Sequence, residues 1–211
     1  MSAASRRATA ALAAADPVLA ALIERVPAAR LDETQAERPE DHYGSLIRAI
    51  TGQQLSVKAA AKIYERVIEF FDGNVPTPQQ LLDADAEALR EAGGLSRAKT
   101  GYLRSLAEHV VSGELELARL EDLRDEEVIA ELVAVKGLGV WTAQMFLMFH
   151  LSREDVLPTG DLGIRRAIMI EYGLEALPAP AQITELAEAW RPHRTLACLY
   201  LWASVDATPD A

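Results

Sequence analysis

Apolar residues recur along most of this chain every three or four positions, the spacing that places them on one face of an α-helix. The segment after Ser56, a favourable N-cap residue, shows the pattern clearly, with apolar side chains at 57, 60, 61, 64, 67, 68 and 71. Glycine and proline interrupt the pattern between segments. Helices are predicted at residues 17–26, 43–50, 57–71, 78–84, 85–93, 96–111, 121–135, 140–151, 162–173, 183–190 and 196–205. No β-rich stretch stands out, so the predicted fold is all-α.

The composition is that of an ordinary folded protein. Half of the 211 residues are hydrophobic, enough to bury a core. No run approaches the roughly 20 apolar residues of a membrane-spanning helix, so no membrane partner is predicted. Residues 1–15 combine Arg6 and Arg7 with an alanine-rich stretch that is too weakly apolar for a signal peptide, so we predict a helix or a frayed start there. We therefore predict a cytoplasmic protein.

The single cysteine, Cys198, limits the possible cofactors. A disulfide within the chain, a four-cysteine zinc site and a cysteine-ligated iron–sulfur cluster each need several thiolates. Cys198 lies in the apolar run LACLYLW, where a small buried hydrophobe is the simplest interpretation. We therefore predict no iron–sulfur cluster.

The formal net charge of -11 argues against simple electrostatic binding of nucleic acid. The sequence KGLG, however, separates two predicted helices, and Gly137 and Gly139 there permit a tight turn and close approach of another backbone. The exposed amides of such a turn and the positive end of the next helix can hold a phosphate. The basic residues that could assist are Lys136, Arg97, Lys99, Arg165 and Arg166. An ordinary turn between helices is the alternative interpretation.

A second candidate element is the sequence LPTGDLGIRR. Pro158 and Gly160 bend a loop that presents Asp161 at the start of a predicted helix. An aspartate in that position is usually a helix N-cap. Taken alone, Asp161 therefore fits either a structural cap or a catalytic carboxylate.

Together, the hairpin and the loop that ends in Asp161 resemble the helix-hairpin-helix Gly/Pro-Asp superfamily of DNA glycosylases. Within it, the sequence is similar to the bacterial 3-methyladenine DNA glycosylases II. The similar segments are AITGQQLSVKAAAKIYERV, GLSRAK, VKGLGVWTAQMF, LPTGDLGI and RPHRTLACLYLW. The N-terminal β-rich domain of that branch has no counterpart here, and Met145 and Leu162 stand where aromatic residues are expected.

The resemblance implies two helical subdomains with the cleft for DNA and the flipped base between them. We expect one subdomain to comprise residues 1–41 with 154–211, and the other to comprise 42–153 and end in the hairpin. The resemblance makes Asp161 the catalytic residue. It places Trp141 where strand-cutting relatives have a Schiff-base lysine, which predicts a monofunctional enzyme.

The resemblance also assigns contacts with DNA and the base. Gln53, Gln54 and Leu55 would fill the gap left by the flipped nucleotide, with Gln54 the best aligned, although a polar interhelical turn is the alternative. The predicted base pocket consists of Trp141, Trp202, Met145 and Leu162, with core packing the alternative for the two tryptophans. The predicted phosphate contacts are Gly137, Gly139, Thr142, Lys136, Arg97 and Lys99. A Na⁺ or K⁺ ion would bind the main-chain carbonyls of Val133, Val135 and Leu138.

The predicted function is base excision repair. The enzyme would flip an alkylated purine, 3-methyladenine or 7-methylguanine, out of double-stranded DNA and hydrolyse its N-glycosidic bond to leave an abasic site. We expect no catalytic cofactor, no protein partner, a monomer, and association with the nucleoid during repair. A non-catalytic DNA-binding module and a glycosylase for another damaged base are the alternatives.

Overall fold

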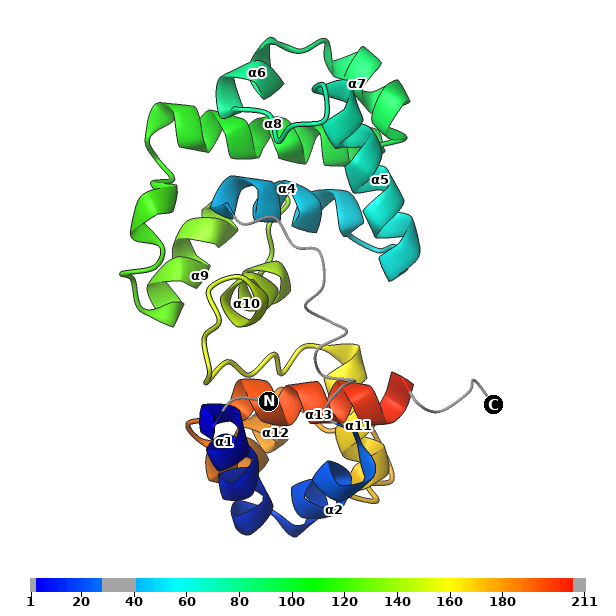
Figure 1. Cartoon of the computed structure of the whole chain (residues 1–211), viewed down its shortest axis with the longest axis vertical. Coiled ribbons are helices and arrows are strands. Elements are labelled where there is room, and N and C mark those ends of the chain that lie inside the picture. The colour runs from blue at the N-terminus through cyan, green and yellow to red at the C-terminus, as the bar shows by residue number, and fades with distance from the viewer. Residues whose placement is uncertain (1–2, 28–40, 207–211) are drawn as a thin grey trace. The chain divides into compact units, whose positions relative to one another are not determined.

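A computed structural model describes residues 3–27 and 41–206, and every regular element in those ranges is a helix (Figure 1). This confirms the predicted all-α class. The chain divides into two compact units. One comprises Met1–Glu37 with Ser152–Ala211, and the other comprises Arg38–Leu151. Among the described residues, no helix combines the length and apolar character needed to cross a bilayer.

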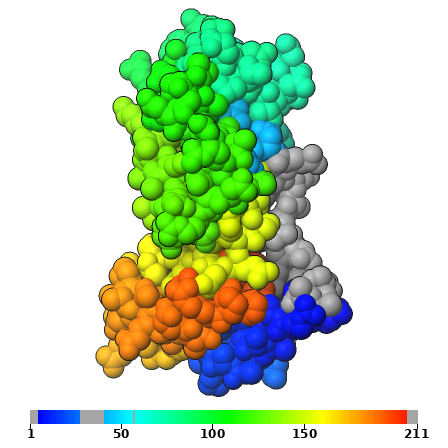
Figure 2. Space-filling view, turned by 90° about the vertical axis from the view of Figure 1, so that its left-hand side faces the viewer, coloured from blue at the N-terminus to red at the C-terminus, as the bar shows by residue number. Residues whose placement is uncertain are grey.

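The Arg38–Leu151 unit is built around α8 (Arg97–Ser112). Its other elements are α4 (His42–Gly52), α5 (Val57–Phe70), α6 (Pro78–Asp83), α7 (Ala86–Gly93), η2 (Leu117–Arg119), α9 (Asp125–Ala134) and α10 (Val140–Phe149). Helix α8 packs against α4 on one side and against α6 and α7 on the other (Figure 1). The residues from α8 to α9, in green, cover much of one face of this unit (Figure 2).

Buried aliphatic residues hold this unit together. Leu46, Ile47 and Ile50 on α4 are fully buried, as are Leu103 and Leu106 on α8. Their spacing of three and four residues gives each helix one apolar face. The same two helices place the functional turns described below.

The described residues of the other unit form five α-helices and a 3₁₀ turn. These are α1 (Ala3–Ala15), α2 (Pro17–Arg25), α11 (Leu162–Glu171), α12 (Pro180–Leu186), η3 (Ala187–Trp190) and α13 (Arg194–Asp206). Helix α13 contacts α2 and α11, and Cys198 at its centre is fully buried. Burial raises the pKa of the Cys198 thiol, which suits a packing role and not a nucleophile.

The observed helices follow the predicted ones with two informative differences. One helix is predicted at 121–135, but α9 begins only at Asp125. Just before it, the Arg124 amide donates a hydrogen bond to the Glu127 carboxylate, 2.9 Å. The segment predicted as one helix at 183–190 is the end of α12 followed by the 3₁₀ turn η3. Apolar spacing alone does not separate an α-helix from a short 3₁₀ continuation.

One buried carboxylate joins three elements of the second unit. Asp16 is the N-cap of α2 and accepts hydrogen bonds from the Val18 and Leu19 amides, 2.8 and 3.3 Å. Its other oxygen accepts from the Tyr172 hydroxyl and, at 2.9 Å, from the Trp190 indole nitrogen. Burial raises the pKa of Asp16, but these hydrogen bonds outweigh burial and lower it below its usual value.

We predict that Asp16→Asn destabilises the protein by about 2 kcal/mol at pH 7, because a charged acceptor of several buried donors becomes neutral. The ionised carboxylate stabilises the fold above its unfolded pKa near 3.8, and this contribution is lost as the pH falls through the lowered native pKa. Urea unfolding from pH 7 down to pH 3 measures the difference between the two proteins. A difference that stays constant over this range would contradict the role given to the charge.

Candidate active site

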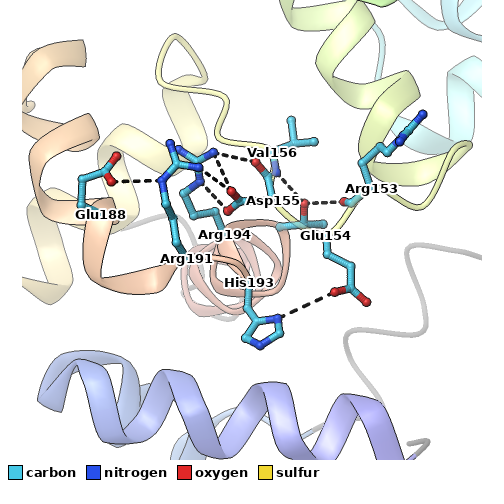
Figure 3. A network of polar contacts seen from close by, with 9 residues as sticks. Arg153, Glu154, Asp155, Val156, Glu188, Arg191, His193 and Arg194 are labelled. Atoms are coloured by element: carbon cyan, nitrogen blue, oxygen red, sulfur yellow. Dashed lines mark hydrogen bonds and ion pairs between the residues drawn. The ribbon is translucent and has the colours of Figure 1, made fainter. Parts of the chain in front are cut away.

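The segment that leads to Asp161 is anchored by a cluster of ion pairs (Figure 3). The Asp155 carboxylate accepts hydrogen bonds from Arg194 Nε, 2.6 Å, and Arg194 Nη2, 3.0 Å, and also pairs with Arg191. The Arg194 side chain is only 12% exposed, so this two-point contact is partly shielded from water. Arg191 also pairs with Glu188, which extends the cluster to η3.

Hydrogen bonds to Thr195 fix the same segment to the start of α13. The Thr195 hydroxyl donates to the Arg153 carbonyl, 2.7 Å, and accepts from the Val156 amide, 3.1 Å. The Thr195 amide donates to the Glu154 carbonyl, 3.0 Å. Arg194 Nη2 also donates to the Asp155 carbonyl, 2.8 Å, so the loop before Asp161 has its backbone held over four consecutive residues, 153–156.

Asp161 is both a helix cap and a fixed carboxylate. It is the N-cap of α11, and its Oδ1 accepts from the Ile164 amide at 2.8 Å. The same oxygen accepts from Trp202 Nε1 at 2.9 Å. Two donors from different helices thus set the orientation of this partly buried side chain. The two interpretations of Asp161 are compatible, because a carboxylate that caps a helix keeps its negative charge.

Gly163 makes the contact between Asp161 and Trp202 possible. A Cβ atom at this position would lie 3.0 Å from Trp202 Cδ1 and 3.1 Å from Asp161 Oδ1. A side chain at position 163 would therefore require the indole or the carboxylate to shift by a few tenths of an ångström. The sequence predicted Trp202 as a base-pocket residue but did not reveal this positioning role, and the only local signal was the glycine two residues after Asp161.

The turn between α4 and α5 carries the three residues predicted to enter DNA. The Leu55 amide donates to the Gly52 carbonyl, 3.2 Å, around Gln53 at φ -52° and ψ 133° and Gln54 at φ 59°. This is the geometry of a type II turn, in which a residue with positive φ occupies the third position. Gln54 and Leu55 are exposed, whereas the Gln53 side chain donates to the Gly137 carbonyl, 2.8 Å. Of the three predicted residues, Gln54 and Leu55 are therefore the two that are exposed to solvent.

The hairpin turn joins α9 to α10, and its two glycines differ in role. Gly137 has φ 97°, and a Cβ there would come within 2.1 Å of Tyr102 Cγ, so it is required both by backbone conformation and by packing. Gly139 has an ordinary φ of -100° and open space where a side chain would be. Of the two glycines, only Gly137 is therefore required by the backbone conformation and packing of the turn. Gly139 precedes α10 as an N-cap residue that makes no side-chain hydrogen bond to the helix.

The residues predicted to contact phosphate are not equivalent. Lys136 and Arg97 are exposed, while Thr142 is buried in the first turn of α10.

The Lys99 ammonium donates to the carbonyls of residues 51 and 53, each at 2.8 Å, and burial lowers the pKa of Lys99. Arg165 Nε donates to the carbonyl of residue 178, 3.1 Å, and Arg166 is exposed. Lys99 thus has a structural contact that the sequence did not predict.

The predicted base-pocket residues lie on both units. Trp141 is 48% exposed and Leu162 is 64% exposed, so Trp141 is not a core residue. Met145 and Trp202 are partly buried. Their assignment to one pocket stays a prediction.

The main-chain cation site predicted at Val133, Val135 and Leu138 is compatible with the turn. The Val135 carbonyl accepts from the Leu138 amide, 3.0 Å. A carbonyl oxygen has two lone pairs, so this bond leaves one for an ion. A hard monovalent cation suits such oxygen donors, and its binding stays a prediction.

A family model described as HhH-GPD superfamily base excision DNA repair protein matches residues 47–192. The chain belongs to this superfamily. The match spans the α4–α5 turn, the hairpin and Asp161, which confirms the resemblance inferred from those segments.

The chain is similar over most of its length to the following proteins. DNA-3-methyladenine glycosylase 1 of Schizosaccharomyces pombe is 39% identical over 165 residues, which are 77% of this chain and 72% of that protein. DNA-3-methyladenine glycosylase 2 of Escherichia coli is 33% identical over 180 residues, 81% of this chain and 60% of that protein. The structure of an S. pombe 3-methyladenine DNA glycosylase in complex with abasic DNA has a TM-score of 0.80, 33% identity, and coverage of 97% of this chain and 99% of that one.

We predict that Gly163→Ala separates Trp202 from Asp161. The added methyl group collides with both side chains, so unfolding free energy should fall by about 1–3 kcal/mol although alanine favours a helix. The indole N–H resonance of Trp202 in a ¹H–¹⁵N spectrum should shift upfield as its hydrogen bond is lost. Gly160→Ala, at a position with open space, is the matched control. An unchanged Trp202 resonance in Gly163→Ala would show that the indole tolerates the methyl group in place.

Proposed function

We propose that this HhH-GPD protein is a monofunctional DNA glycosylase that releases alkylated purines, 3-methyladenine and 7-methylguanine, from double-stranded DNA. The observation that carries the proposal is the Asp161 carboxylate, oriented by the Ile164 amide and the Trp202 indole. The relatives named as 3-methyladenine glycosylases supply the substrate class. The product would be a free base and an abasic site in an uncut strand.

The chemistry suits a carboxylate that acts without a strong general acid. An alkylated purine carries a positive charge, so the glycosidic bond breaks with both electrons passing to the base nitrogen, and the base leaves neutral. Positive charge then develops on the sugar, where a fixed carboxylate stabilises it. Water adds its oxygen to the anomeric carbon, and its proton passes to Asp161 or to solvent.

The absence of a lyase step rests on Trp141. An indole cannot form the Schiff base that a lysine forms with the sugar, and position 141 is where the resemblance places that lysine. The exposed indole instead offers an electron-rich face to a positively charged base. Trp202, Met145 and Leu162 are the further residues that we assign to base recognition.

Because the chain is acidic overall, we propose that it binds DNA through a few groups on the hairpin and on the α4–α5 turn. Helix α10 begins after Gly139 with no side-chain cap, and its first amides are the groups that would donate to a phosphate. Lys136, Arg97 and a monovalent cation on the hairpin carbonyls would add positive charge there. Gln54 and Leu55, displayed on their turn, would replace the flipped nucleotide in the stack.

We expect Asp161→Asn to reduce the single-turnover rate of 7-methylguanine release by about 100-fold or more, because the developing charge loses its counterion. Asparagine is also a good N-cap, and its amide oxygen can accept from the same two donors, so the fold and the affinity for DNA should change little. Rapid-quench assays on methylated duplex and binding to an abasic-site analogue measure the two quantities. Base release at the wild-type rate would remove Asp161 from the mechanism.

A substrate panel tests the reaction class. We expect release of 3-methyladenine and 7-methylguanine, no release of 8-oxoguanine, and no covalent adduct after borohydride treatment, since no Schiff base forms. A trapped adduct would contradict the monofunctional assignment. Retention of methylated DNA without release of any base would support the binding-module alternative instead.

A further inference from the structure

A lysine on α8 holds the backbone of the turn between α4 and α5. The Lys99 ammonium donates to the Thr51 carbonyl in the last turn of α4 and to the Gln53 carbonyl just after it, both at 2.8 Å. The carbonyls at a helix C-terminus form its negative end, so a cation is favoured there. Lys99 therefore caps α4 from a neighbouring helix, at the point where the chain turns toward Gln54.

The turn contains a residue in an unfavourable conformation. Gln54 has φ 59° at the position of a type II turn that normally takes glycine or asparagine. A positive φ destabilises a residue other than glycine by about 1 kcal/mol or more. The conformation therefore persists only where surrounding contacts impose it. The contacts of Lys99 lie on residues 51 and 53, directly before the strained residue.

The same helix also fixes the hairpin. Tyr102 follows Lys99 by three residues on α8, so both side chains lie on one face of the helix. The Tyr102 ring is so close to Gly137 that a Cβ there would overlap it. Gln53 completes the link by donating its side-chain amide to the Gly137 carbonyl, 2.8 Å. One turn of α8 thus holds the α4–α5 turn and the hairpin at a set separation.

We propose that Lys99 is a positioning residue that locks the α4–α5 turn in the conformation in which Gln54 and Leu55 enter DNA, and that it is not a phosphate ligand. The proposal rests on the glycosylase function proposed above. A turn ordered before DNA arrives avoids the entropy loss of ordering it during base flipping. Partial burial of the ammonium, which lowers the pKa of Lys99, agrees with a charge directed at protein carbonyls.

The first test measures the turn without DNA. In Lys99→Met, amide hydrogen exchange of residues 50–57 should accelerate at least tenfold, while exchange in α9 and α10 stays as in the wild type. Lys62→Met, at an exposed lysine on α5, is the matched control and should leave the turn unchanged. Unchanged exchange at 50–57 in Lys99→Met would overturn the proposal. If Lys99→Met does not fold, Lys99→Gln, which keeps a hydrogen-bond donor, takes its place with an intermediate acceleration expected.

The second test separates positioning from phosphate binding. For Lys99→Met we expect the single-turnover rate of 7-methylguanine release, and the fluorescence rise of 2-aminopurine placed beside the lesion, to fall about tenfold. The dissociation constant for undamaged duplex should change less than twofold. The slope of the logarithm of the binding constant against the logarithm of the salt concentration should keep its magnitude. Arg97→Met should instead weaken binding and lower the slope by about one, as the loss of a phosphate contact does. A slope lowered by about one in Lys99→Met would overturn the proposal.

A double substitution tests whether Lys99 acts through Gln54. If it does, Lys99→Met should lower the rate less than threefold in a Gln54→Ala background, against tenfold in the wild type. Equal effects in the two backgrounds would contradict the proposal. Failure of the wild-type protein to release any base would refute the glycosylase function, whereas the exchange experiment would still decide whether Lys99 holds the turn.

Discussion

The hydrogen bond between the Trp202 indole and Asp161 is the contact on which the rest of the proposed chemistry depends. It joins the N-terminus of α11 to the middle of α13, and Gly163 leaves the space that it needs. The loop before Asp161 is anchored to the start of the same α13 by Arg194 and Thr195. A single helix therefore positions both the carboxylate and the segment that carries it, so the orientation of the charge follows from the packing of one helix.

The hairpin and the α4–α5 turn are organised by another single helix in the same way. Helix α8 contacts the hairpin through Tyr102 and the turn through Lys99, and Gln53 connects the two loops directly. Loops that contact a ligand are useful when a rigid element fixes them. Within the Arg38–Leu151 unit, this rigid element is α8, whose Leu103 and Leu106 are fully buried.

Features that depend on neighbouring residues in the chain were predictable from sequence. Ser56, Asp16 and Asp161 cap the helices that follow them, because N-capping involves residues only two or three positions apart. Contacts between distant segments were not predictable. Trp202 lies 41 positions from Asp161, and the Lys99 ammonium reaches carbonyls 46 and 48 positions away. The different roles of Gly137 and Gly139 were also not predictable, because a GxG pattern does not say which glycine needs positive φ and which has open space around it.

The uncapped N-terminus of α10 has a consequence for control of the protein. The peptide N–H groups proposed to hold a phosphate there do not titrate and cannot be acetylated, unlike the Lys136 ammonium proposed beside them. The share of the affinity that these amides supply would thus vary little with pH and would resist modifications that neutralise lysine. Control of this share would have to act on the geometry of the backbone, and the packing of the Tyr102 ring against Gly137 is the contact that sets that geometry.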